Sequence, residues 1–341
     1  MILIYSDLHI KKQTRISGNF LRDNLATIAE LTRIKEENNV TTIIFLGDIF
    51  ETIGTVSFEL MDIAYTEIEK LHKNVNSYFL VGNHDLSRGK TILRSFPGKI
   101  IDLPQIRVIE GIKFYFYPSG GTWLVSEEAD VLLAHIALKE GELDASNVKL
   151  HNATSVSEFA NTFPLGFLGH FHCFQMVLPD RYWYVGSPLQ LSFGEAGQKK
   201  YCLLFDGNNI EWKQMTAARE FITIQVDKEV KEIILGSTTD ELNEQFSKYI
   251  VKFIIPGTDK IFQRLLERKE PLFDFVVEYM PLYAKPNARN EIIGVNMHEV
   301  VKNYIELIKP GNPDSLYKKG MEIIENVGVQ EFGDSEFFVS R

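Results

Sequence analysis

The chain has few cysteines, no long apolar run and no excess of positive charge. Its 341 residues include only two cysteines, Cys173 and Cys202, too few for a disulfide framework. No apolar run approaches the length of a membrane span, and the opening MILIYSDLHI lacks the basic region of a signal peptide. We therefore expect a reducing, cytosolic setting. The net charge of −10 argues against a long basic surface for nucleic acid, so any contact with DNA must be local or shared with a partner.

What is present is typical of an ordinary globular protein. Hydrophobic residues make up 45% of the chain and charged residues 24%, which supports a sizeable core. We find no internal repeat and no low-complexity tract. A length of 341 residues predicts two domains, or one large domain with additions.

The first two hundred residues alternate short apolar runs with stretches of helical periodicity. The helical stretches are 19–39 and 57–74, and the strand-like runs are 1–6, 41–47, 76–82, 112–118, 130–138, 164–170, 181–186, 200–206 and 209–215. The all-apolar strands indicate burial on both faces, and FDGNNI between the last two is typical of a hairpin turn. The pattern predicts an α/β fold of mixed sheets with helices outside.

The pattern changes after about residue 216. Strands at 220–227, 251–257 and 272–281 alternate with helices at 238–250 and 259–269, which predicts a small α/β unit. The stretch YAKPNARNE has the composition of a linker, and two amphipathic helices follow at 297–309 and 313–328. The predicted boundaries are a first domain at 1–215, a second at 216–283, a linker at 284–291, a helical segment at 292–328 and a tail at 329–341.

Five of the strand-like runs end in carboxylate, imidazole or carboxamide side chains. Ligands bind at strand ends in open α/β sheets, so these side chains are candidates to converge. The pair His170 and His172 alone leaves a structural role open, but seven side chains in this arrangement favour metal binding. Nitrogen and oxygen donors without thiolate suit Mn, Fe or Zn, and seven are enough for two ions that share a bridge. The candidates are Asp7, His9, Asp48, Asn83, His135, His170 and His172.

These positions form a series of motifs in order: D-x-H, G-D, G-N-H-D, H and G-H-x-H. The series resembles the calcineurin-like metallophosphoesterases. The segment VGSPLQLSFGE, at 185–195, further resembles the SbcD and meiotic recombination eleven type of DNA-repair nuclease subunit. The short length is similar to that of a phage or compact bacterial member, acting in the bacterial or host cytosol. The resemblance implies a sandwich of two mixed sheets with flanking helices, a small α/β capping domain and a C-terminal helical pair.

The resemblance also implies a role for each position. One metal is expected to take Asp7, His9, Asp48 and His172, and the other Asp48, Asn83, His135 and His170, with Asp48 as the bridge. Two Mn²⁺ are the expected ions, although the donors also suit Fe or Zn. His84 is expected to position the phosphate or to protonate the leaving oxygen.

Two acidic neighbours, Asp85 and Glu51, and five other residues also receive an interpretation. Asp85 is expected to be structural and to orient His84. Glu51 stands where some members of the family carry a second histidine. Cys173 is expected to be a small buried residue, and His72 a surface or helix residue. Arg88, Lys90 and Arg94, just beyond the catalytic loop, are either a solvated face or a contact for the DNA backbone.

The activity expected from the resemblance is Mn-dependent hydrolysis of DNA phosphodiesters, as exonuclease or endonuclease, in DNA repair, recombination or replication. The expected partner is an SbcC-type coiled-coil ATPase bound through residues 290–330, with a homodimer inside a two-plus-two assembly and no membrane. Two alternatives stay open. One is a stand-alone phosphatase or cyclic-nucleotide phosphodiesterase with the same metals, and the other is a scaffold on a decayed phosphoesterase fold.

Overall fold

The computed structural model describes residues 1–14, 17–122, 128–142, 153–256 and 274–280. They belong to the first of two units into which the chain divides, Met1–Leu282 and Tyr283–Arg341. The predicted helix at 259–269, the linker, the two C-terminal helices and the tail lie outside the described residues, and the domain boundaries stay a prediction. In the described parts, no helix is long and apolar enough to cross a membrane.

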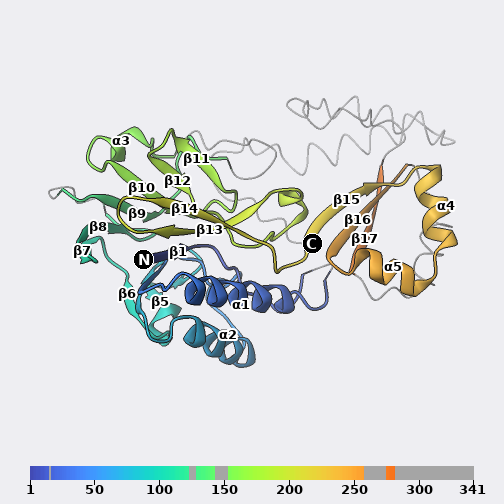
Figure 1. Cartoon of the computed structure of the whole chain (residues 1–341), viewed down its shortest axis with the longest axis horizontal. Coiled ribbons are helices and arrows are strands. Elements are labelled where there is room, and N and C mark those ends of the chain that lie inside the picture. The colour runs from blue at the N-terminus through green and yellow to red at the C-terminus, as the bar shows by residue number, and fades with distance from the viewer. Residues whose placement is uncertain (15–16, 123–127, 143–152, 257–273, 281–341) are drawn as a thin grey trace, which may run out of the picture. The chain divides into compact units, whose positions relative to one another are not determined.

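Two six-stranded mixed sheets form the first part of the chain, as the sequence predicts (Figure 1). The first has the order β14-β13-β1-β2-β3-β6 and the second the order β11-β12-β10-β9-β8-β7. The bounds in the first sheet are β1 (Ile2–Tyr5), β2 (Thr42–Phe45), β3 (Asn76–Leu80), β6 (Lys99–Ile101), β13 (Lys200–Phe205) and β14 (Ile210–Met215). Those in the second are β7 (Gln105–Ile109), β8 (Ile112–Tyr117), β9 (Val131–His135), β10 (Leu165–Gly169), β11 (Gln175–Leu178) and β12 (Tyr182–Tyr184).

The two sheets pack face to face, with helices on the outer sides. Side chains alternate between the faces of a strand, so Ile2 and Ile4 of β1 enter the core between the sheets, while Leu3 and Tyr5 face the opposite layer. Helices α1 (Leu21–Glu37) and α2 (Phe58–Leu71) lie side by side over that layer (Figure 1). The short α3 (Ser157–Ala160) covers the second sheet. The predicted fold class is confirmed.

A third, three-stranded sheet has its own core. Its strands β15 (Glu220–Gln225), β16 (Tyr249–Pro256) and β17 (Phe275–Met280) are parallel, and α4 (Lys228–Gly236) and α5 (Thr239–Phe246) pack with them. Asp227 caps α4 through the Val230 amide, and Thr238 with Glu241 forms a capping box on α5.

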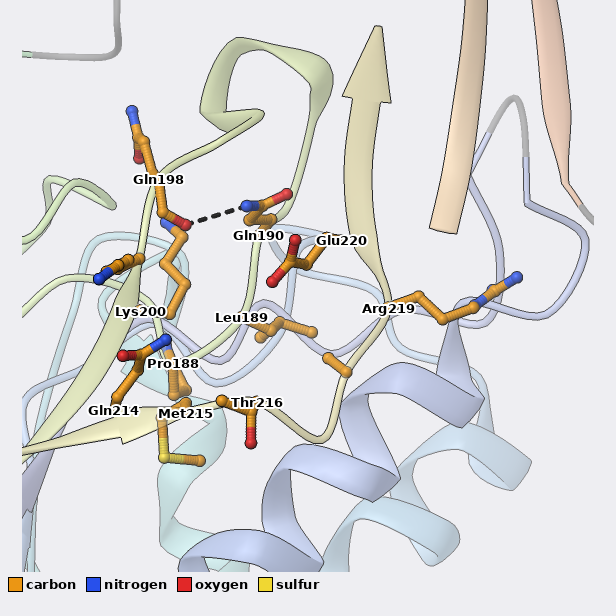
Figure 2. Close-up of a pocket in the computed structure, with 12 residues that line it drawn as sticks. Pro188, Leu189, Gln190, Gln198, Lys200, Gln214, Met215, Thr216, Arg219 and Glu220 are labelled. Carbon is orange, nitrogen blue, oxygen red and sulfur yellow. Dashed lines mark hydrogen bonds between the residues drawn. The ribbon is translucent and has the colours of Figure 1, made fainter. Parts of the chain in front are cut away.

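The link between β14 and β15 is held by charged and amide side chains. Arg219 donates to Asp23 of α1 at 2.8 Å and to Asp274 at 2.8 Å. Gln190 accepts from the Phe221 amide at 2.6 Å and donates to the Gln198 carbonyl at 2.9 Å. A pocket opens here between the segments 188–190, 198–200, 214–216 and 218–220 (Figure 2).

His72 is at the C-terminal end of α2, but it is buried, so the surface interpretation is wrong. Its ring stacks on Phe79 with centroids 4.6 Å apart, and Nε2 lies 2.9 Å from the Tyr5 hydroxyl. Burial, with a smaller contribution from the positive Lys35, lowers the pKa of His72 to about 3. The imidazole is therefore neutral in the folded protein at every pH near neutrality.

This burial predicts a loss of stability in acid. Because the folded pKa lies below the unfolded value of about 6.5, the unfolded chain takes up the proton first as the pH falls. The resulting loss in the free energy of unfolding is absent above pH ~6.5 and grows to about 2–3 kcal/mol by pH ~4.5. Replacing His72→Gln, which does not titrate, should reduce the fall in melting temperature between those pH values. Identical pH profiles for the two proteins would contradict the assignment.

Candidate metal centre

The predicted strand ends meet at one edge of the two packed sheets. β1, β2 and β3 are parallel, so the residues that follow them emerge on the same side: Asp7 and His9, then Asp48, then Asn83. In the second sheet β9 ends in His135, and the parallel β10 leads into the segment that carries His170 and His172.

Six of these side chains form two clusters whose potential ligand atoms lie within 4.8 Å of one another. We call Asp7, His9 and His172 the first cluster, and Asp48, His135 and His170 the second cluster. In the first cluster the Nε2 atoms of His9 and His172 face each other at 3.1 Å. Asp7 is fully buried, and its carboxylate accepts from the His170 amide at 3.1 Å.

Asp48 and Asn83 connect the clusters. Asp48 Oδ2 lies 3.3 Å from His135 Nε2 in its own cluster and 3.6 Å from His9 Nε2 in the first cluster. Asn83 Oδ1 lies 3.0 Å from His135 Nε2 and 2.9 Å from His170 Nδ1. All seven predicted side chains are therefore brought together, with Asp48 at the position a bridge requires. Their role as ligands stays a prediction.

Four of the seven residues have a left-handed backbone. The φ angles are +50° at Asp7, +44° at His9, +62° at Asp48 and +100° at His170. Non-glycine residues rarely adopt positive φ, and such conformations gather at functional sites that the surrounding structure holds in place. Here the turn at each strand end directs the side chain back over the sheet edge.

Two motif glycines allow the strand ends to approach each other. A Cβ on Gly82 would lie 2.2 Å from Asp48 Oδ1, and one on Gly47 would lie 2.6 Å from His135 Nδ1. Gly47 also has a φ of +106°, which other residues rarely adopt. The glycines in G-D and G-N-H-D therefore allow close packing of the strand ends, and the polar residues beside them are the candidate metal ligands.

The centre has a strongly negative potential. Burial alone would lower the pKa of His9, but Asp7, Glu51 and Asp48 outweigh it and raise the pKa to about 10. Burial would likewise lower the pKa of His135, but the Asp48 carboxylate outweighs burial and the pKa rises to about 9. For His170, burial and the nearby His135 lower the pKa to about 4. A site that binds protons this firmly also attracts a divalent cation, which displaces them.

The donor set fits such cations. Imidazole nitrogens and carboxylate oxygens converge, and two Nε2 atoms face each other across the first cluster, where a cation satisfies both. The thiol of Cys173 is not among them, since its Sγ is buried and accepts from Gln198. The expectation of a small buried Cys173 agrees with its position.

His84 lies beside the first cluster. Its ring packs edge-on against His9, with centroids 4.8 Å apart, and its amide donates to Asp48 Oδ1 at 2.8 Å. Nδ1 lies 2.7 Å from the Glu51 carbonyl oxygen, so it donates there and leaves Nε2 available. This arrangement suits a group that acts on a phosphate oxygen.

Asp85 is structural, as expected, but its carboxylate does not orient the His84 ring. It is buried, and its carboxylate accepts three backbone N–H groups, from Asp48 at 2.8 Å, Ile49 at 3.0 Å and Gly82 at 2.9 Å. It therefore ties the G-D turn to the G-N-H-D turn and makes no contact of its own with the His84 ring among the hydrogen bonds of the described residues. Burial and the nearby Asp48 carboxylate raise the pKa of Asp85 to about 6.

Glu195 and Lys200 are the residues that motif reading misses. Glu195 Oε1 lies 3.2 Å from His172 Nδ1, and Lys200 Nζ donates to Glu195 Oε2 at 2.5 Å. Both side chains are 4% exposed. The segment VGSPLQLSFGE pointed to this loop, but nothing in the sequence pairs Glu195 with a residue 23 positions away.

The three predicted basic contacts have different surroundings. Arg88 and Lys90 are exposed on the hairpin of β4 (Leu86–Ser87) and β5 (Lys90–Thr91), just after His84. Positive φ at Arg88 and Gly89 gives the two-residue turn that a tight hairpin prefers. Arg94 instead pairs with Asp102 at 2.9 Å.

Comparison with known proteins identifies the class. Residues 1–174, just over half of the chain, match the calcineurin-like phosphoesterase family, and the chain belongs to this family. Membership confirms the predicted class of metal-dependent phosphoesterases, whose members bind divalent metals, and the resemblance seen in the sequence.

Two individual proteins are also similar. One is exonuclease subunit 1 of Enterobacteria phage T4, 23% identical over 198 residues, a match that covers 52% of this chain and 57% of the phage protein. The chain thus spans just over half the length of that relative. The other is the nuclease MPE of Pseudomonas putida, whose structure gives 17% identity and a TM-score of 0.31 over 62% of this chain and 87% of that one.

Proposed function

We propose that the chain is a DNA phosphodiesterase, the nuclease subunit of an SbcCD-like complex, with two divalent cations. Asp7, His9, Asp48 and His172 would hold one cation, and Asp48, Asn83, His135 and His170 the other. The observation that carries the proposal is the pair of clusters with Asp48 between them. When bound, the two cations supply Lewis-acid activation of a phosphate ester and of the attacking water.

The chain's own residues supply position and a proton. The turns at the strand ends hold the seven donors, and Asp85 ties two of these turns together. His84, fixed through Nδ1 by the Glu51 carbonyl, presents Nε2 to the leaving oxygen and donates a proton to it as the ester bond breaks. Imidazole suits this task because its ordinary pKa of about 6.5 lies near working pH.

DNA is the proposed substrate for two reasons. The similarity to a phage exonuclease subunit supports it, and so do the exposed Arg88 and Lys90 on the hairpin after His84, where they can reach backbone phosphates. Arg94 is a weaker candidate because Asp102 already neutralises it.

The word subunit in that relative's name supports a partner as well. We take this to be an SbcC-type coiled-coil ATPase bound through residues 290–330, in a two-plus-two assembly around a homodimer, with work in DNA repair, recombination or replication in the bacterial or phage-host cytosol. The net charge of −10 is consistent with a partner that supplies most of the contacts with the DNA backbone. Mn²⁺ is the proposed ion.

The test is hydrolysis of linear double-stranded DNA by the full chain in Mn²⁺, in Mg²⁺ and in EDTA, beside a small phosphodiester. We expect cutting that needs Mn²⁺ and falls about 10²-fold in His84→Ala, because the leaving oxygen loses its proton donor. Mn²⁺ affinity, measured by calorimetry, should be unchanged in that variant. Hydrolysis of the small ester without any DNA cutting, even with the ATPase added, would favour a stand-alone phosphatase or cyclic-nucleotide phosphodiesterase. No hydrolysis of either substrate would favour a scaffold.

A further inference from the structure

The two clusters differ in the groups that contact the imidazole nitrogen pointing away from the candidate metal position. In the first cluster, His172 Nδ1 lies 3.2 Å from Glu195 Oε1, and His9 Nδ1 lies 3.2 Å from Glu51 Oε2. In the second cluster, the Nδ1 atom of His135 lies 2.7 Å from the Leu46 carbonyl oxygen, which is a neutral acceptor. Carboxylates therefore lie beside both imidazoles of the first cluster, whereas a neutral oxygen supports His135 in the second.

Glu195 is held firmly in this position. Lys200 Nζ donates to its second oxygen at 2.5 Å, and the Leu191 amide donates to the same oxygen at 3.2 Å. Lys200, which lines the pocket in Figure 2, is fixed in turn by the His172 carbonyl at 2.9 Å and by Ser187 Oγ at 3.0 Å. The ammonium group of Lys200 and the Leu191 amide thus both stabilise Glu195 as a carboxylate.

Glu51 makes a looser contact of the same kind. Its side chain is 45% exposed and divides its interaction between His9 and Lys11 Nζ, which lies 3.4 Å away. The approach to His9 Nδ1 is not aligned as a hydrogen bond. We therefore expect a smaller effect from Glu51 than from Glu195.

A carboxylate behind a ligating imidazole has two effects. It holds the proton on Nδ1, which leaves the Nε2 lone pair for a cation, and it increases the basicity of that nitrogen. The Nε2 atoms of His9 and His172 face each other at 3.1 Å, so both lone pairs then point into the same space. Two unshared lone pairs at this distance repel each other until a cation binds.

We propose that Glu195, with Glu51 in a smaller role, positions the imidazoles of the first cluster and makes it the tighter of the two cation sites. The proposal rests on the proposed function, because it requires that both clusters bind metal. Glu195 acts through His172 and is a positioning residue. The loss of such a partner lowers metal affinity by about 10- to 100-fold in other metal sites.

The test is a calorimetric titration of Mn²⁺ alone into the EDTA-stripped full chain. We expect two binding events of unequal affinity. Glu195→Gln should weaken the tighter event by about 10- to 100-fold and change the weaker event less than about threefold, while Glu51→Gln should weaken the tighter event by less than about tenfold. Glu211→Gln, which removes an exposed partner of Lys213, is the matched control and should change neither event.

A second variant separates positioning from support of the fold. Lys200→Met breaks the same buried ion pair but keeps the Glu195 contact with His172. It should lower the melting temperature as Glu195→Gln does, yet weaken the tighter event less than Glu195→Gln does, because Glu195 Oε1 can still reach His172 Nδ1. If Glu195→Gln fails to fold, the double variant Glu195→Gln with Lys200→Met leaves no unpaired buried charge and allows the same titration.

The outcomes are distinct. Equal affinities for the two cations, a change confined to the weaker event, or the same loss of affinity in Lys200→Met and Glu195→Gln would each overturn the positioning role. Absence of Mn²⁺ binding by the wild-type chain would instead overturn the proposed function itself. EPR of Mn²⁺ bound at one equivalent gives an independent signature, which Glu195→Gln should change and Glu211→Gln should not.

Discussion

Asp48→Asn should lower phosphodiesterase activity by about 10⁴-fold or more, which corresponds to roughly 5–6 kcal/mol of transition-state stabilisation. Its carboxylate lies between the clusters, 3.6 Å from His9 Nε2 and 3.3 Å from His135 Nε2. An amide of the same shape carries no charge, so its oxygen would bind two cations far more weakly than the carboxylate oxygen Oδ2 does. We expect calorimetry to show weaker Mn²⁺ binding in both events, whereas Glu195→Gln should affect only one.

A matched control is available in Asp180→Asn. Asp180 is exposed and, like Asp48, has a left-handed backbone, with φ of +54° beside +62°. Asparagine tolerates this conformation as well as aspartate does, so the backbone effect of the substitution is the same at the two positions. Unchanged activity is expected for Asp180→Asn. Activity of Asp48→Asn within about tenfold of the wild type would exclude a bridging role for Asp48.

The sequence predicts the inner strands of the fold well and the outer elements poorly. The run TIIF of β2 is fully buried, so its apolar pattern is unmistakable. The edge strand QIRVI of β7 has one buried residue and two exposed ones, one of them an arginine, so its pattern resembles a loop. Helix α4 has only nine residues, too few for a clear helical periodicity, although Asp227 supplies a capping residue at its start.

In the candidate site, the residues at strand ends are predictable from the sequence, whereas the loop residues that contact them are not. The motif residues could be found because strand ends in α/β proteins fix where Asp7, His135 and His172 emerge. The contact of Glu195 with His172 depends on how a loop folds back, which no periodicity encodes. Glu51 was noted only as a departure from the family pattern. Its contacts, through the carboxylate with His9 and through the carbonyl with His84, required the three-dimensional arrangement.

Asp85 shows how a structural role can be predicted correctly while the partners of the side chain are not. Its place beside His84 in the chain predicts that it orients that ring, but the peptide turns so that its carboxylate points under the site. There it accepts the amides of Asp48, Ile49 and Gly82, which belong to two different strand ends. The side chain therefore determines the distance between the turns that carry Asp48 and Asn83.

Asp85→Ala should accordingly destabilise the chain by roughly 3–5 kcal/mol. It leaves three buried N–H groups without an acceptor, each of which costs about 1–3 kcal/mol, partly relieved by water that enters the space. Asp85→Asn keeps one acceptor oxygen and also removes the repulsion from the Asp48 carboxylate, so its loss should be smaller. Thermal and urea denaturation of the EDTA-stripped chain measure both.

Asp227→Ala is the matched control for this series. Asp227 is exposed and caps α4 by accepting a single N–H, from Val230 at 2.8 Å, so its removal should cost about 1 kcal/mol. At temperatures where Asp85→Ala remains folded, its Mn²⁺ affinity should also fall, because the turns of Asp48 and Asn83 are no longer tied together. A loss of stability with unchanged Mn²⁺ affinity would mean that the glycine contacts alone align the two turns, and that Asp85 serves only the fold.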